Sequence, residues 1–289
     1  HDQEKTSSCQ IVAAIRRNWM RRLIVVSLAV SALLLALAPL AFTVPPLACP
    51  PDMVQAGPIC VDTYEASVWQ TKDAKIIEAI RTGKIARVEE LRAGATQHGG
   101  EKDDYGEGCP DNGNGCKDFY AVSIPGVMPA RYLTWFQAVA ACRNAGKRLL
   151  SNAEWQMAAL GTPDPGADGD GVKGCNTTKK TDAVLTGAVS VCVSDVGAFD
   201  MVGNVWEWVG DWMQDNGDTE AGDQSSRTYG QDAVFGIDEA VPHGDRFPAA
   251  WIRGGSYAVP TGTDAGVFAL RANISPSHFR NDMGFRCGR

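Results

Sequence analysis

Eight of the nine cysteines in this 289-residue chain follow a single uncharged apolar segment, residues 23–44. An even number of cysteines beyond such a segment indicates an exported domain held by disulfides, because the cytosol keeps thiols reduced. Eight cysteines allow about a hundred pairings, so the sequence leaves the connectivity open. The spacing favours three local pairs and leaves one long-range pair. These are Cys49–Cys60, Cys109–Cys116, Cys175–Cys192 and Cys142–Cys287.

The apolar segment predicts either a cleaved signal peptide or an uncleaved transmembrane anchor. At a rise of ~1.5 Å per residue, a helix of this length covers ~33 Å, and a bilayer core is ~30 Å thick. The length favours an anchor, because a signal core has ~7–15 apolar residues. Four arginines between positions 16 and 22 predict a cytoplasmic N-terminus. Residues 1–22 are therefore expected to be cytoplasmic or, since Met20 resembles a natural start, an upstream extension of the reading frame.

In either case, residues 45–289 are expected to be exported to the periplasm or cell surface as one domain. When residues 1–44 are set aside, Lys+Arg falls from 27 to 22 and Asp+Glu from 34 to 32, which leaves a net charge of −10. This acidic balance argues against nucleic acid and anionic lipid as partners. The expected partner is an unidentified protein or small-molecule ligand, with membrane contact only through an uncleaved N-terminal segment.

Periodicity and capping residues predict an α+β domain with little regular structure. Thr134 is a plausible N-cap for a helix over 133–145, which Gly146 ends. Ser151 and Glu154 have the spacing of a capping box for a helix that runs to 161. The remaining predictions are two short helices in 72–93, a short strand at 61–64, and a surface loop over 94–118.

Short motifs recur in a fixed order through the second half of the chain. These are GKRL at 146–149 with AEW at 153–155, GNVWEW at 203–208, RGGS at 253–256 and GFR at 284–286. In order and spacing they resemble the formylglycine-generating enzyme or sulfatase-modifying-factor family, with a match from about 129 to 289. The resemblance implies an irregular relative of the C-type lectin fold. It also implies the Cys142–Cys287 disulfide.

Glu207 lies between two tryptophans, so its carboxylate is expected to be buried and therefore paired or metal-bound. Asp200 lies seven residues earlier, and two carboxylates across a turn suit calcium. The family has a calcium site here, and the resemblance implies the side chains of Asp200 and Glu207 with the carbonyls of Gly203 and Val205 as its ligands. The alternative is an ion pair between Glu207 and an arginine such as Arg253. The resemblance places a second calcium site near Asn176 and Thr177.

The oxidases of this family bind copper through two thiolates just after RGGS. Residues 257–268 hold no cysteine, and none lies between Cys192 and Cys287. Soft thiolates select Cu(I), so copper is not expected here, nor is oxidation of a substrate cysteine by that mechanism. Other branches use histidine-bound iron, but His98, His243 and His278 lack a ligand spacing.

Residues 257–282 combine aromatic groups, arginines and small polar residues, which suits recognition. The candidate contacts are Tyr257, Phe268, Arg271, His278, Phe279 and Arg280. Ordinary loop packing around a disulfide core is the alternative. The placement between RGGS and GFR also resembles variable ligand-binding proteins diversified by retroelements. We therefore expect an exported binding module, with a formylglycine-generating-type oxidase as the alternative function and a structural envelope protein as a third.

Overall fold

The computed structural model describes Trp19 and residues 47–102, 104–164, 174–177, 181–213, 227–229, 232–235, 249–259 and 262–289. The chain divides into two compact units, His1–Pro46 and Leu47–Arg289. The apolar segment 23–44 lies outside the described residues, as does the preceding segment 1–22 apart from Trp19. Among the residues that are described, no helix combines the length and apolarity needed to cross a membrane. The signal or anchor therefore stays a prediction.

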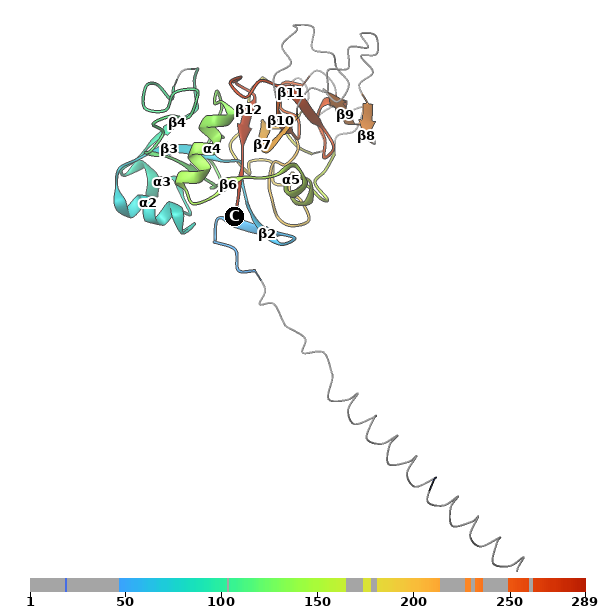
Figure 1. The fold of residues 1–289 in the computed structure, drawn as a ribbon, viewed down its shortest axis with the longest axis horizontal. Helices are drawn as coiled ribbons and strands as arrows, with labels where there is room; N and C mark the ends of the chain where they lie inside the picture. Colours follow the sequence, from blue (N-terminus) through green and yellow to red (C-terminus); the bar gives the residue numbers. More distant parts are fainter. Residues whose placement is uncertain are drawn as a thin grey trace, which may run out of the picture. The chain divides into compact units, whose positions relative to one another are not determined.

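The unit Leu47–Arg289 combines short strands with a few short helices, which confirms the mixed α and β class (Figure 1). The largest sheet has the strand order β12-β7-β10-β11-β9-β8. Its strands are β7 (Trp206–Met213), β8 (Arg227–Tyr229), β9 (Asp232–Phe235), β10 (Ala249–Arg253), β11 (Leu270–Ile274) and β12 (Met283–Phe285).

Two smaller sheets use the N-terminal strands of this unit. One has the order β1-β2-β13-β6, so the final strand of the chain lies between an early strand and a central one. Its strands are β1 (Met53–Ala56), β2 (Ile59–Asp62), β6 (Arg148–Leu149) and β13 (Cys287–Gly288). The other has the order β4-β3-β5, with β3 (Ser67–Gln70), β4 (Thr96–His98) and β5 (Phe119–Val122).

The helices begin where the capping residues predict. Thr134 accepts a hydrogen bond from the Gln137 amide at the start of α4 (Trp135–Asn144). Ser151 and Glu154 form the predicted capping box of α5 (Asn152–Ala158). The two short helices in 72–93 are α2 (Ala74–Arg81) and α3 (Val88–Arg92), and a single 3-10 turn, η1 (Gly262–Asp264), follows the RGGS motif.

Some predicted boundaries were wrong. The helix expected to run to 161 ends at Ala158 as α5, and a turn follows at 159–161. The strand expected at 61–64 is β2, which begins two residues earlier because it pairs with β1 across a turn at Gly57. The stretch 94–118 is not all loop, since Thr96–His98 form β4 at the edge of the β4-β3-β5 sheet. β4 is short, polar and partly exposed, so it lacks the alternation of apolar residues that marks a strand in a sequence.

Four disulfides join all eight cysteines of the unit, in the pairs that the spacing favours. They are Cys49–Cys60, Cys109–Cys116, Cys142–Cys287 and Cys175–Cys192. The Cys142–Cys287 bridge spans 145 residues of sequence and ties α4 to β13. It therefore fixes the last strand of the chain against the central helix.

Large aromatic side chains from distant parts of the chain form the main core. The largest are Trp69, Phe119, Trp206, Trp208 and Phe285, each at most 2% exposed. A second cluster joins β2, α5 and β7 through Val61, Trp155 and Val209. The core therefore lies where the three sheets meet α4 and α5.

Candidate functional site

The motifs that carry the family resemblance lie side by side in the largest sheet. β7 carries the Trp-Glu-Trp part of GNVWEW, and it pairs in parallel with β12, which places Gly284 opposite Glu207. On its other side β7 pairs with β10, which places Arg253 opposite the same glutamate. Three motifs that are far apart in the sequence therefore converge on Glu207.

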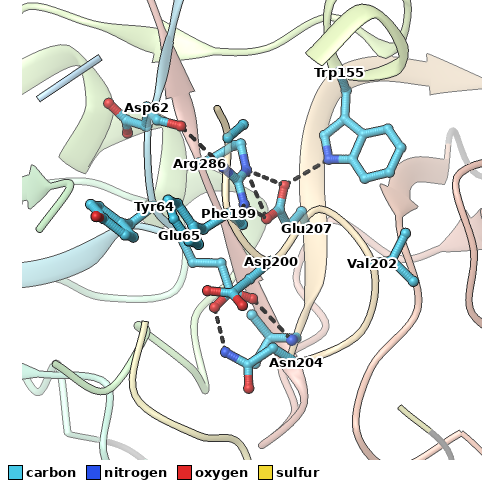
Figure 2. A network of polar contacts seen from close by, with 12 residues as sticks. Asp62, Tyr64, Glu65, Trp155, Phe199, Asp200, Val202, Asn204, Glu207 and Arg286 are labelled. Carbon is cyan, nitrogen blue, oxygen red and sulfur yellow. Dashed lines mark hydrogen bonds and ion pairs between the residues drawn. The ribbon is translucent and has the colours of Figure 1, made fainter. Parts of the chain in front are cut away.

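Glu207 forms a buried ion pair with Arg286, the arginine of GFR (Figure 2). The Arg286 Nε lies 2.8 Å from each carboxylate oxygen, and Nη2 lies 2.7 Å from Oε1. The Trp155 indole donates to Glu207 Oε2 at 2.6 Å. Arg286 donates its remaining hydrogens to the carbonyls of Asp62 and Phe199. Both charges are fully enclosed, so each depends on the other for compensation.

The ion-pair alternative for Glu207 thus holds, but with Arg286 in place of Arg253. Arg253 instead lies over the Trp155 ring, with its guanidinium carbon 4.8 Å from the ring centroid. It also donates to the carbonyls of Phe268 and Ala269. Arg253 therefore packs β10 against α5 and the segment that follows η1.

Two further carboxylates, Glu65 and Asp200, lie beside this ion pair (Figure 2). Glu65 accepts hydrogen bonds from the Val205 amide and the Asn204 side chain. Burial raises the pKa of Glu65 well above its usual value, and the negative charges of Asp200 and Glu207 add to that rise. Burial also raises the pKa of Asp200 to about 6, against the lowering effect of the Gly187 amide and Arg286. The network therefore holds three acidic groups around one arginine.

The predicted calcium ligands fit this network only in part. Asp200 Oδ2 accepts from the Gly187 amide, and Asp200 Oδ1 is buried without a hydrogen-bond partner. Both oxygens of Glu207 are held by Arg286 and Trp155. The Gly203 amide donates a hydrogen bond to the Gly254 carbonyl, and the Val205 amide donates one to Glu65. Asp200 therefore has one carboxylate oxygen without a partner, whereas both oxygens of Glu207 are engaged, and the calcium site stays a prediction.

The second predicted calcium position, near Asn176 and Thr177, is hydrogen-bonded to Asn204 of the same network. The Asn176 side chain donates to Asn204 Oδ1 at 3.0 Å and to the Asp182 carbonyl. Thr177 is fully buried, and its hydroxyl has no partner. A calcium site at Asn176 and Thr177 stays a prediction.

The six predicted contact residues do not form one continuous surface. Tyr257 is only 2% exposed, which corrects its expected place on the outside, because its ring packs against Ala183 and Val205. Phe268 is 43% exposed, beside Arg253. Arg271 lies over the Trp206 ring at 5.3 Å. Tyr257, Phe268 and Arg271 therefore have different neighbours from the other three predicted contact residues, which follow β11.

His278, Phe279 and Arg280 form that second group, next to the start of α4. The Tyr132 amide donates to the Arg280 carbonyl at 2.9 Å, which fixes this segment. The ammonium of Lys102 lies 5.9 Å from the Phe279 ring centroid. Burial and the Arg280 charge lower the pKa of His278, although Asp282 partly offsets them. This group is exposed or half-buried and can contact a ligand.

Asp282 joins this group to the RGGS motif, and the sequence analysis missed it. Its Oδ2 accepts from Ser256 at 2.9 Å and from Arg280 at 2.8 Å. Asp282 is 1% exposed. An acidic residue directly before the apolar Met283 of β12 was the available signal, because a carboxylate entering a buried strand needs partners. Asp282 and Ser256 therefore belong to the candidate site.

The segment after RGGS offers no thiolate. Every cysteine in 47–289 is disulfide-bonded, and none falls between Cys192 and Cys287. Both ring nitrogens of His98 have hydrogen-bond partners, the Asp104 carbonyl and the Gln70 side chain. His243 lies outside the described residues. Among the described residues, no group of three or more His, Cys, Asp or Glu side chains is placed to hold a metal.

Two solved structures are similar to this chain at low sequence identity. A Major Tropism Determinant I1 variant has 19% identity and a TM-score of 0.46, over 84% of this chain and 54% of that one. Treponema denticola variable protein 1 has 16% identity and a TM-score of 0.42, over 83% of this chain and 92% of that one.

Two curated relatives are named formylglycine-generating enzymes. One from Streptomyces coelicolor is 32% identical over 178 residues, which is 55% of this chain and 52% of that protein. One from Thermomonospora curvata is 36% identical over 101 residues, which is 29% of this chain and 33% of that protein. The chain thus spans about half the length, or less, of these relatives. The model of the sulfatase-modifying factor enzyme 1-like domain matches residues 54–289, so the chain belongs to that family.

Proposed function

We propose that this chain is a binding module on a formylglycine-generating-enzyme-like scaffold, without the family's thiolate–copper oxidation. The observation that carries the proposal is the pairing of all eight cysteines of Leu47–Arg289 in four disulfides. A copper centre of the family type needs two thiolates after RGGS, and this chain has neither of them. The scaffold motifs remain, and Glu207 and Arg286 from two of them form the buried ion pair.

The contact surface lies within residues 257–282. Its accessible part includes Phe268 and the group His278, Phe279 and Arg280, in which Arg280 pairs with the buried Asp282. An aromatic ring, an imidazole and a guanidinium over a rigid base suit recognition of a protein or small molecule. Sequence variation confined to this segment among close relatives would mark it as a diversified receptor surface.

Four disulfides also support an exported location, because such bridges persist in oxidising compartments. We propose the periplasm or the cell surface. An uncleaved anchor would hold the N-terminus in the cytoplasm.

Oxygen uptake tests the proposal. The purified chain is loaded with copper, supplied with reductant and given a cysteine-containing substrate peptide. The S. coelicolor formylglycine-generating enzyme serves as the positive control. We expect uptake no faster than that of copper and peptide alone. Copper-dependent turnover above that background would support the second candidate, an oxidase of the type that the relatives' name describes.

Calcium is a separate proposal that rests on Asp200. One oxygen of this buried carboxylate has no partner, and a neighbouring acidic group raises the local negative charge. Melting temperature with calcium and with a chelator tests it. We expect calcium to raise the melting temperature of the wild type and not that of Asp200→Asn. Equal curves with calcium and chelator would remove the proposal.

A further inference from the structure

Three buried polar atoms lie around Tyr257 without a hydrogen-bond partner. They are the Tyr257 hydroxyl, Asp282 Oδ1 and Arg131 Nε. Their residues are 2%, 1% and 8% exposed. Buried polar groups in folded proteins almost always have a hydrogen-bond partner, so three buried polar atoms without one in the same neighbourhood require an explanation.

Contacts of neighbouring residues bring the three residues into one region. Ser256, the residue before Tyr257, donates directly to Asp282. Arg131 pairs with Asp182, whose neighbour Ala183 packs against the Tyr257 ring. In keeping with this, burial raises the pKa of Tyr257, the charges of Asp182 and Asp282 raise it further, and Arg131 lowers it. Tyr257, Asp282 and Arg131 therefore share one neighbourhood, and each has one polar atom without a partner.

The cluster reaches the solvent through its two exposed members. The side chain of Arg280, bonded to Asp282, is 44% exposed. The side chain of Asp182, bonded to Arg131, is 60% exposed. Arg131 and Asp282 therefore each contact a side chain at the protein surface.

The chemistry of the three unpartnered atoms defines what would satisfy them. Asp282 Oδ1 accepts a hydrogen bond, Arg131 Nε–H donates one, and a neutral tyrosine hydroxyl does either. The four charged residues, Arg131, Arg280, Asp182 and Asp282, sum to zero. An anionic or cationic ligand therefore gains little electrostatic attraction at this site. A neutral ligand with an adjacent acceptor and donor forms hydrogen bonds through both groups.

We propose that Tyr257, Asp282 and Arg131 form a binding site for a carboxamide group. The ligand's carbonyl oxygen accepts from the Tyr257 hydroxyl and Arg131 Nε–H, and its N–H donates to Asp282 Oδ1. This inference deepens the proposed function and rests on it, since it assigns a chemical class to the ligand of the segment 257–282.

Titration of the full chain with three small probes, followed by tyrosine-ring NMR signals, tests the ligand class. The probes are acetamide, acetate and acetamidinium, which share their size and differ in charge. We expect saturable shifts with acetamide, at a dissociation constant of the order of ten millimolar, as suits a ligand of so few atoms. The two ions should bind at least about fivefold more weakly. Equal or tighter binding of either ion would overturn the proposal.

Tyr257→Phe tests the hydroxyl, with Tyr120→Phe on β5 as the matched control. Removing one hydrogen bond should weaken acetamide binding about fivefold, while the control binds as the wild type does. Because the Tyr257 hydroxyl has no partner in the protein, the variant should melt no lower than the control. Unchanged acetamide binding, or clear destabilisation relative to Tyr120→Phe, would show that the hydroxyl serves the fold instead.

The probe comparison needs only the wild-type chain, so it decides the ligand class even if a variant fails to fold. The oxygen-uptake assay separates this inference from the proposed function. Turnover of a cysteine peptide contradicts the binding module, whereas failure of acetamide to bind contradicts only the carboxamide site.

Discussion

The Glu207–Arg286 pair shows how single residues hold this fold. Glu207 belongs to one family motif and Arg286 to another, and both are enclosed between β7, β12 and α5. Enclosing two charges is costly, so the pair is stable only while both partners remain. Glu207 and Arg286 therefore stabilise the scaffold.

Glu207→Gln should lower the free energy of unfolding by about 3–5 kcal/mol, because Arg286 would stay buried without a charged partner. Chemical denaturation measures this loss. Glu89→Gln on the exposed side of α3 is the matched control, and it should change stability by no more than about 0.5 kcal/mol. A similar small loss for both variants would contradict the buried ion pair.

Glu154 makes stability depend on pH at the acid end. Arg148 holds the pKa of Glu154 at about 2, with help from Ser151. A lowered pKa in the folded state adds stability that is complete above the usual value of 4.5 and is lost as pH falls toward 2. Arg148 is half exposed, so solvent screening limits the effect to about 1 kcal/mol or less. The stability gap between wild type and Glu154→Gln should therefore shrink below pH 4.5, and a gap that is constant with pH would refute this.

At the scale of elements, disulfides and caps decide which segments meet. The caps of α4 and α5 are visible in the sequence because Thr134, Ser151 and Glu154 act on neighbouring residues. The pairing of β7 with β12 and the edge strand β4 are not visible in the sequence, because they depend on contacts between distant segments. Asp282 was missed for the same reason, since its partners lie at Ser256 and Arg280 in the folded chain. Local chemistry and the Cys142–Cys287 disulfide were predictable, whereas the pairing of distant strands was not.

The two bridges at Cys142–Cys287 and Cys109–Cys116 should differ in their contribution to stability. The first closes 145 residues and the second closes 7. On the chain-entropy model, removing them costs about 5 and about 2–3 kcal/mol respectively. Paired alanine variants, compared by denaturant unfolding, measure both losses. A larger loss for the short bridge would contradict the assigned role of Cys142–Cys287.

At the scale of the whole molecule, the chain keeps its family's scaffold and lacks its family's thiols. The motifs GNVWEW, RGGS and GFR meet in one sheet. The segment after RGGS leads to Tyr257 and the Asp282 cluster. We propose that the same architecture serves recognition in place of copper-dependent oxidation.

Alkylation of free thiols in the denatured, unreduced chain, followed by peptide mass spectrometry, tests this account most directly. We predict that none of the eight cysteines in residues 47–289 is alkylated and that all eight are recovered as the four disulfide-linked pairs. Two alkylated cysteines among residues 47–289, in a preparation that also retains Cu(I), would contradict it.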